Sequence, residues 1–272
     1  MLGVYAVMSA AVMLLLNIPF DIFTSSWSWW AVPFIFVGII LGFIILHTAI
    51  LALCILFVNT YKPSRDSAFF RFWVNGFIDT AFTLFRIKVH SSGLEKVPQD
   101  EPFLLVCNHI DNLDPIVIYS QLPDSQIAFI AKKDVRTIMP FIYKAIYKLG
   151  GLLIDRENNR EAVKTIVSAS KLIKENKNSV AIFPEGYTSK SGELQPMRNG
   201  AFKIATKAQC KMAVCTVWGT KSILKNLLRR KTDVYFNVID VIDVNSSMHT
   251  AELGEKVHEM MSQSLKQYNN GE

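Results

Sequence analysis

The stretch from Asn108 to Pro115 contains the residue types of a general base and its partner. It reads Asn-His-Ile-Asp-Asn-Leu-Asp-Pro and follows directly on the apolar run Phe103 to Cys107, so a buried strand delivers a histidine to a loop. The spacing between His109 and Asp114 suits a turn in which the carboxylate folds back onto the imidazole. A carboxylate on one ring nitrogen fixes the tautomer and leaves the other nitrogen free to take a proton from a hydroxyl. His109 is therefore the candidate base, and Asp114 is its partner.

Asp114 and Pro115 are also residue types that are common at the start of a helix. They precede the apolar residues 116–118, and an N-cap aspartate followed by proline at the first helical position is a common pattern. Both interpretations can hold at once, because one carboxylate can cap a helix and contact His109.

Two further apolar runs end in polar residues that could form the same site. Val180 to Ile182 leads into Phe183-Pro184-Glu185-Gly186, and Leu152 to Ile154 leads into Asp155-Arg156. Open α/β sheets place their sites at the carboxyl ends of strands. Taken alone, Pro-Glu-Gly is an ordinary turn and Asp155-Arg156 is a surface ion pair. Together with His109, the three strand ends predict one site.

The elements that must position these residues can be read from the hydrophobic pattern after residue 86. Short apolar runs alternate with helical patterns, the clearest of which covers about Arg160 to Lys174. The runs are Ile87–Val89, Phe103–Val106, Ile127–Ala131, Leu152–Ile154, Val180–Phe183, Val214–Val217 and Val234–Val241. A terminal helix is expected near 251–268. The alternation predicts an α/β fold with a mixed, partly parallel sheet flanked by helices.

The front of the chain has a different composition. Between Met1 and Tyr61 the only charged side chain is Asp21, and the runs Leu2 to Phe20 and Ala31 to Val58 are nearly unbroken apolar sequence. Each is long enough for the ~20 residues that cross ~30 Å of hydrocarbon. We predict a membrane-anchoring helical hairpin over residues 1–60. The connector would place an aromatic belt at the interface, formed by Trp27, Trp29 and Trp30.

Basic residues follow the second apolar run closely. Because Lys62, Arg65 and Arg71 lie there, the positive-inside rule places that end, and all that follows, in the cytoplasm. The expected location is the cell membrane, with the catalytic domain facing the cytoplasm. A re-entrant hairpin that dips into one leaflet is the alternative, and Pro19 and Pro33 favour it. A signal peptide fits poorly, because no basic n-region precedes the first run.

Residues 61–90 are expected to link this anchor to a catalytic domain over residues 91–272. Apolar residues recur there at helical spacing. They are Phe69, Trp73, Phe77 and Leu84. The helix could lie in the membrane interface or pack as core against the catalytic domain, and the sequence leaves both possibilities open.

The charge balance indicates anionic partners. The formal net charge is +6, and basic residues come in clusters such as Lys132 with Lys133 and the run from Lys221 to Lys231. Lipid headgroups and phosphorylated substrates both fit. Nucleic acid does not, because no binding motif accompanies the basic residues. The four cysteines show no CxxC pairing, and the histidines show no ligand spacing, so no metal site is expected.

In order and spacing, these motifs resemble those of the lysophosphatidic-acid acyltransferase family, the 1-acyl-sn-glycerol-3-phosphate acyltransferases. The family is defined by N-H-x-x-x-x-D, followed by G-x-x-x-I-D-R and F-P-E-G. Here these are Asn108 to Asp114, Ile154-Asp155-Arg156, and Phe183 to Gly186. The resemblance covers essentially the whole chain after Ile87 and implies the glycerolipid acyltransferase fold.

The resemblance also implies an activity. His109 would deprotonate the free hydroxyl of 1-acyl-glycerol-3-phosphate, which then attacks an acyl thioester to give phosphatidic acid, while Asp114 orients the base. The co-substrate would be acyl-CoA or acyl carrier protein, and no cofactor is implied. Backbone N–H groups at the start of the helix after Asp114 are our candidates for stabilising the oxyanion.

Four residues would bind the acceptor. Arg156 would hold its phosphate through the fork of a guanidinium, and Lys132 would add positive field. Glu185 and the backbone of Gly186 would shape the acceptor site.

This chain departs from the family pattern at several positions. Asp111 replaces a serine or threonine, Tyr187 and Thr188 replace the usual Thr-Arg after F-P-E-G, and Thr216 replaces a proline. The missing arginine at Thr188 removes a cation that would help to neutralise a phosphate dianion. The alternative acceptors are another lysolipid or glycerol 3-phosphate. From a different class, the chain could be a catalytically inactive membrane-surface lipid-binding protein. A hydrolase is disfavoured because no G-x-S-x-G motif occurs.

Overall fold

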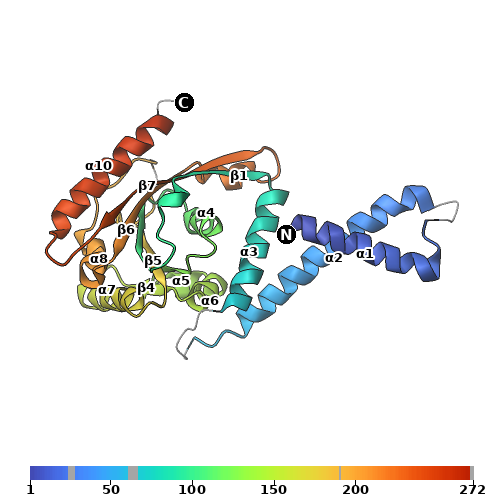
Figure 1. Ribbon diagram of the computed structural model, residues 1–272, viewed down its shortest axis with the longest axis horizontal. Coiled ribbons are helices and arrows are strands. Elements are labelled where there is room, and N and C mark those ends of the chain that lie inside the picture. Colours follow the sequence, from blue (N-terminus) through green and yellow to red (C-terminus); the bar gives the residue numbers. More distant parts are fainter. Residues whose placement is uncertain (24–27, 61–66, 190, 270–272) are drawn as a thin grey trace.

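A seven-stranded sheet covered by helices on both faces forms the body of the protein, and a helical hairpin projects from it (Figure 1). The computed structural model describes residues 1–23, 28–60, 67–189 and 191–269. The strands are β1 Ile87–Ser92, β2 Leu104–Cys107, β3 Ile127–Lys132, β4 Leu152–Ile154, β5 Ser179–Ile182, β6 Lys211–Trp218 and β7 Thr232–Asp243. Each of the seven predicted runs overlaps a strand, and only Phe103 and Phe183 lie one residue outside β2 and β5, which confirms the predicted α/β class with a mixed sheet.

The order of the strands is β1-β7-β6-β2-β5-β3-β4. The strands from β6 to β4 run parallel to one another, whereas β7 is antiparallel to β6 and parallel to β1. The carboxyl ends of β2, β4, β5 and β6 therefore lie along one edge, where the three predicted strand ends meet. Because β2 is central, its residues Leu104 to Cys107 are completely buried and form one continuous apolar run.

Helices bury both faces of the sheet. The helices are α3 Ala68–Leu84, α4 Asp114–Gln121, α5 Val135–Ile138, α6 Pro140–Lys148, α7 Asn159–Lys174, α8 Lys203–Ala208, α9 Lys221–Asn226 and α10 Thr250–Asn269, with short 3-10 turns η1 Leu94–Lys96 and η2 Asn199–Phe202. Along β2, Leu105 and Cys107 enter the core under α3 and α4. Leu104 and Val106 enter the core under α7, α8 and α10. This alternation is the two-residue period of a strand.

Helices α1 (Leu2–Phe20) and α2 (Ser28–Leu56) form the projecting hairpin. Within the described residues, one helix is long and apolar enough to cross a membrane, Trp30–Leu56, while the apolar part of α1, Leu2–Ile18, is shorter. Only 17% of the most apolar window of α2 is buried, unlike the core helix of a soluble protein. The hairpin thus has an apolar surface of the kind that lipid covers.

The structure differs from some predictions about this N-terminal part, and others concern residues outside the described ranges. Trp29 and Trp30 lie in the first turn of α2 instead of in a connector, and Pro33 does not interrupt that helix. Trp27, and the basic residues Lys62 and Arg65 on which the orientation was predicted, lie outside the described residues. The predicted boundary between residues 61–90 and 91–272 falls within β1.

Helix α3 has one face packed against the catalytic domain and another with exposed aromatic residues, so it combines the two possibilities that the sequence left open. Phe70, Gly76, Ile78 and Thr80 are buried, whereas other aromatic side chains of the helix are exposed. The hairpin is fixed to α3 through His47 of α2. Its Nδ1 accepts from the Tyr5 hydroxyl at 2.7 Å, and its Nε2 donates to the carbonyl oxygen of Trp73 at 2.8 Å. These bonds join α1, α2 and α3, so the apolar hairpin and the sheet are positioned by the same helix.

Candidate active site

His109 and Asp114 are in contact beyond the end of β2. Nδ1 of His109 is 2.8 Å from Oδ2 of Asp114. The imidazole is 12% exposed and the carboxylate is fully buried. Because a carboxylate only accepts, Nδ1 carries the hydrogen of this bond and Nε2 keeps its lone pair. The ring therefore has the tautomer that a general base requires.

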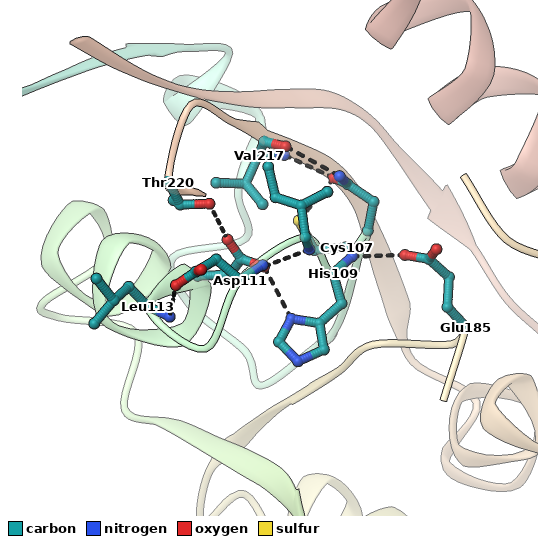
Figure 2. A network of polar contacts seen from close by, with 10 residues as sticks. Cys107, His109, Asp111, Leu113, Glu185, Val217 and Thr220 are labelled. Atoms are coloured by element: carbon teal, nitrogen blue, oxygen red, sulfur yellow. Dashed lines mark hydrogen bonds and ion pairs between the residues drawn. The ribbon is translucent and has the colours of Figure 1, made fainter. Parts of the chain in front are cut away.

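Three further hydrogen bonds hold the Asp114 carboxylate. Oδ2 also accepts from the backbone N–H of Ile110 at 2.7 Å and of Asp111 at 2.8 Å. Oδ1 accepts from the hydroxyl of Thr220 at 2.5 Å. Figure 2 shows Thr220 approaching from the far side of this network, on the segment that follows β6. With four donors the carboxylate has one orientation, which fixes the plane of the His109 ring.

Helix α4 begins at Asp114, and its N-cap is Leu113, with no side-chain capping bond. The N-cap prediction for Asp114 is wrong, because its carboxylate accepts from N–H groups that precede the helix. The N–H groups of Ile116 and Val117 donate to the Leu113 carbonyl oxygen at 3.0 and 3.1 Å, and Pro115 has no N–H. The predicted oxyanion donors at this helix start are thus already used.

Glu185 supports the backbone on both sides of the site. Its Oε1 accepts from the backbone N–H of His109 at 2.6 Å, and its Oε2 accepts from the backbone N–H of Gln195 at 2.8 Å. Burial raises the pKa of this carboxyl, and the two backbone hydrogen bonds oppose that effect less strongly. With both oxygens occupied and 1% of the residue exposed, Glu185 acts on the site through the main chain that it holds.

The loop that carries His109 is also fixed at its start. The Asn108 amide donates to the Val217 carbonyl oxygen at 3.0 Å and accepts from the Val217 N–H at 2.8 Å, so one side chain ties β2 to β6. The His109 ring stacks on Phe183, with ring centroids 4.1 Å apart. Cys107 does not compete as a nucleophile, because burial raises the pKa of its thiol well above the ordinary value.

A cavity of about 610 Å³ lies beside the Pro-Glu-Gly turn and combines cations with an apolar wall. Its cationic residues are Arg156, Arg198, Lys203 and Lys207, and its apolar residues include Ile130, Ile154, Val163, Ile166, Ile182 and Phe183. Among the residues that the structure describes, no carboxylate lines it. Burial, and then the charge of Arg198, lower the pKa of Arg156. Two guanidinium groups that repel each other here would both gain from a bound anion.

Gly186 makes room for Arg198 over this turn. Its φ is +84°, and a Cβ atom would lie 2.6 Å from Nε and 2.9 Å from Cδ of Arg198. The N–H of Arg198 donates to the Pro184 carbonyl oxygen at 2.8 Å. A residue with a side chain would be strained at this φ and would displace the guanidinium.

Lys132, which the sequence predicted to add positive charge near the acceptor phosphate, is engaged with a neighbouring carboxylate. Its Nζ is 2.6 Å from Asp134 Oδ2, an exposed ion pair that raises the pKa of the lysine. Lys132 and Arg156 both line a second cavity of about 470 Å³. Asp155 pairs with Lys133 at 3.1 Å, so the Asp155-Arg156 ion pair that the sequence allowed does not form. Arg156 lines both cavities and does not pair with Asp155.

Sequence reasoning gave no role to two residues of the site. Thr220 follows β6 and reaches Asp114 only because β6 is the neighbour of β2. Arg198 lies twelve positions after Gly186 in an irregular segment, and no periodic pattern marks it. The absence of the family's arginine at Thr188 could have pointed to Arg198, because a phosphate site that lacks one cation needs another cation nearby.

Residues 88–218 match the family model described as Acyltransferase. The chain is 28% identical over 160 residues to a 1-acyl-sn-glycerol-3-phosphate acyltransferase of Borreliella burgdorferi, covering 58% of this chain and 63% of that protein. It is 27% identical over 192 residues to the protein of the same name from Haemophilus influenzae, covering 68% and 77%. The matches to three further relatives span less than half of those proteins.

Among solved structures, the fold is similar to that of the crystal structure of a 1-acyl-sn-glycerophosphate acyltransferase from Thermotoga maritima. The TM-score is 0.62 at 23% sequence identity, over 84% of this chain and 90% of that chain. This likeness extends beyond the segment that the family model matches.

Proposed function

Because the chain belongs to the acyltransferase family, we propose that it transfers a fatty acyl group from an acyl thioester to the free hydroxyl of 1-acyl-glycerol-3-phosphate. The product would be phosphatidic acid. The observation that carries this proposal is the His109–Asp114 pair, in which a fully buried carboxylate leaves Nε2 of the ring with its lone pair.

The reaction follows from this geometry. Nε2 of His109 takes the proton of the acceptor hydroxyl as its oxygen attacks the thioester carbon, and Asp114 stabilises the imidazolium that forms. The C–O bond forms, the C–S bond breaks, and the thiolate that leaves takes the proton from His109. No acyl-enzyme is required. The donor would be acyl-CoA or acyl carrier protein, and no cofactor takes part.

The cavity of about 610 Å³ is the proposed acceptor site. Arg156 and Arg198 would share the phosphate, and the apolar wall would contact the lipid part of the acceptor. Arg198 supplies the second cation that the sequence lacks at Thr188. This makes a phosphate-bearing acceptor the favoured substrate, ahead of neutral lysolipids.

Membrane association supports a lipid acceptor. The apolar hairpin is fixed to α3, and α3 packs into the core that lies behind the His109 loop. A site attached in this way stays close to lipids in the bilayer. We further propose that the catalytic domain faces the cytoplasm, where acyl thioesters are found.

Acyl transfer from acyl-CoA to lysophosphatidate, measured in detergent and in liposomes, tests the proposal. His109→Ala should lose at least about 10³-fold in kcat. His249→Ala, which removes an exposed histidine directly before α10, is the matched control and should retain wild-type activity.

Acyl carrier protein as donor, and monoacylglycerol, glycerol 3-phosphate and other lysolipids as acceptors, are run in parallel. Activity on another acceptor alone would keep the chemistry and replace the substrate. Activity that survives in His109→Ala would overturn the mechanism. Inactivity with every donor and acceptor, despite binding of lysophosphatidate, would favour the lipid-binding alternative.

A further inference from the structure

Apolar side chains gather on the surface where α5 passes into α6. Ile138, Met139, Phe141 and Ile142 are between 41% and 74% exposed, and Pro140 between them is exposed too. Single exposed hydrophobic residues are normal, but five consecutive exposed apolar residues need a partner. We call residues 138–142 the apolar tip.

The helical stripe that begins at Ile142 continues into a packed core. Ala145 of α6 and Leu149, the residue after the helix, contact a core formed by Leu51 and Ile55 of α2 and Phe70 of α3. The exposed apolar residues at the start of α6 therefore extend this stripe beyond the part that the fold itself covers. Figure 1 shows α6 beside the end of α2 that leads into the catalytic domain.

A direct bond connects α6 to the point where the apolar helix ends. Nζ of Lys144 donates to the carbonyl oxygen of Leu56 at 2.7 Å, and the side chains of Leu56 and Phe57 are exposed beside it. Leu56 is the last residue of the helix that is long enough to cross a bilayer. The apolar tip therefore lies on the domain at the level where that helix would leave the hydrocarbon.

Aromatic residues of α3 extend the same surface. Phe69 and Phe72 are exposed, and both rings contact Trp73, with centroids 5.9 and 5.8 Å apart. Trp73 packs against the same core as Ala145 of α6 and Leu149, the residue after that helix. Exposed apolar groups of α2, α3 and α6 are thus arranged around one small core.

The charges near the apolar tip complement a lipid surface. Arg136 precedes it, and Lys144 and Lys148 follow it within two turns of α6. The acidic neighbour, Asp134, is paired with Lys132. Apolar residues flanked by cations are typical of segments that lie in the headgroup region of an anionic bilayer.

We propose that the apolar tip is a second membrane-binding element, which lies in the headgroup region of an anionic bilayer next to the end of α2. The hairpin anchors the chain, and the tip sets the orientation of the catalytic domain against the same surface. Two attachments would prevent the domain from rotating away from the lipid.

This element would also serve the acceptor, a consequence that rests on the proposed function. Arg136 and Thr137, directly before the tip, line the cavity of about 470 Å³ together with Arg156. A lysolipid could then bring its phosphate to Arg156 while its acyl chain stays among its neighbours in the bilayer. The tip would form the edge over which the headgroup enters.

Spin labels test the location without any assay of activity. Ile138→Cys is labelled in the full chain, in vesicles of phosphatidylcholine with phosphatidylglycerol, after Cys54 and Cys210 are replaced by serine; Cys107 and Cys215 are buried. Val167→Cys, an exposed apolar position on α7, is the matched control. The label at 138 should collide at least about threefold more with oxygen than with a water-soluble nickel complex, relative to the label at 167.

Equal accessibility to the nickel complex at both positions would overturn the proposal. Protection at 138 that appears only after acyl carrier protein is added would also overturn it, because the tip would then be a docking surface for an acidic protein. These outcomes do not depend on whether the chain transfers acyl groups.

A kinetic experiment tests the consequence. The double variant Ile138→Asn with Phe141→Asn should raise the apparent KM for long-chain lysophosphatidate in vesicles at least about fivefold and leave a short-chain, water-soluble acceptor unaffected. Val167→Asn should change neither. Equal loss with both acceptors would show damage to the site and contradict the proposed role in lipid entry.

Discussion

The Oε1 atom of Glu185 lies 2.6 Å from the backbone nitrogen of His109, which joins the Pro-Glu-Gly turn directly to the proposed base. The other oxygen of Glu185 holds Gln195, at the start of the segment that leads to Arg198. One buried carboxylate thus sets the positions of both the imidazole and the second guanidinium. The same side chain therefore supports the proposed base and the proposed phosphate-binding residue.

Replacing Asp114 by asparagine should abolish most catalysis. An amide cannot accept from four donors, and its NH₂ group would face donors or favour the wrong tautomer of His109. We expect kcat to fall about 10³–10⁴-fold. Asp111→Asn is the control. Oδ1 of Asp111 accepts from the Leu113 N–H at 2.9 Å, and the amide oxygen of an asparagine can accept the same hydrogen bond. This control should retain kcat within about threefold; a similar loss in both variants would contradict the assigned role of Asp114.

Thr220→Val should weaken both the fold and the reaction. It removes the hydroxyl that donates to Oδ1 of Asp114 and leaves a buried carboxylate oxygen unpaired. We expect a loss of about 1–3 kcal/mol in the free energy of unfolding and about a 5- to 10-fold lower kcat. Thr220→Ser restores the donor and should recover most of both. Thermal unfolding and initial rates on the same preparations check this, and a serine variant as weak as valine would refute it.

Arg198→Gln should affect binding of the phosphate more than the chemical step. The KM for lysophosphatidate should rise about tenfold, at the lower end of what a charged hydrogen bond provides, with kcat little changed. The activity on monoacylglycerol, which has no phosphate, should not change. Arg160→Gln is the matched control, since Arg160 is exposed in the first turn of α7 but does not line the cavity. An unchanged KM in Arg198→Gln would remove this residue from the acceptor site.

The buried Glu185 should give a characteristic pH dependence of stability. Burial raises the pKa of its carboxyl above the ordinary 4.5, so the native protein retains a proton that the unfolded chain has already lost. Stability from this group is fully present below pH 4.5 and decreases as pH rises through the raised pKa. Glu185→Gln, which does not titrate, should lack this decrease. The difference between the two unfolding curves against pH measures it, and parallel curves would disprove it.

The sequence predicted the strands well because a parallel sheet covered on both faces requires nearly continuous apolar runs. It also placed His109, Glu185 and Arg156 at strand ends, and one edge of the sheet brings those ends together. The helix after Asp155 began one residue before the predicted start. Its cap, Asn158, accepts from the N–H groups of Arg160 and Glu161, and the Asn-x-x-Glu spacing was visible in the sequence.

Other features depended on contacts that no local pattern reports. Local preference favoured Asp114 as an N-cap, but tertiary and loop donors occupy its carboxylate instead. Thr220 contributes because β6 pairs with β2, a pairing between segments more than a hundred positions apart. Arg198 contributes because Gly186 has a positive φ and leaves space above the turn.

The order of the strands also determines when the site can assemble during translation. Because β2 lies between β5 and β6, the proposed base cannot acquire its full set of partners until Thr220 has left the ribosome. The apolar hairpin is translated long before that, and domains begin to fold from the N-terminal side during synthesis. The nascent chain can therefore reach lipid while the proposed catalytic residues are still apart, so that activity would arise where the proposed lipid acceptor resides.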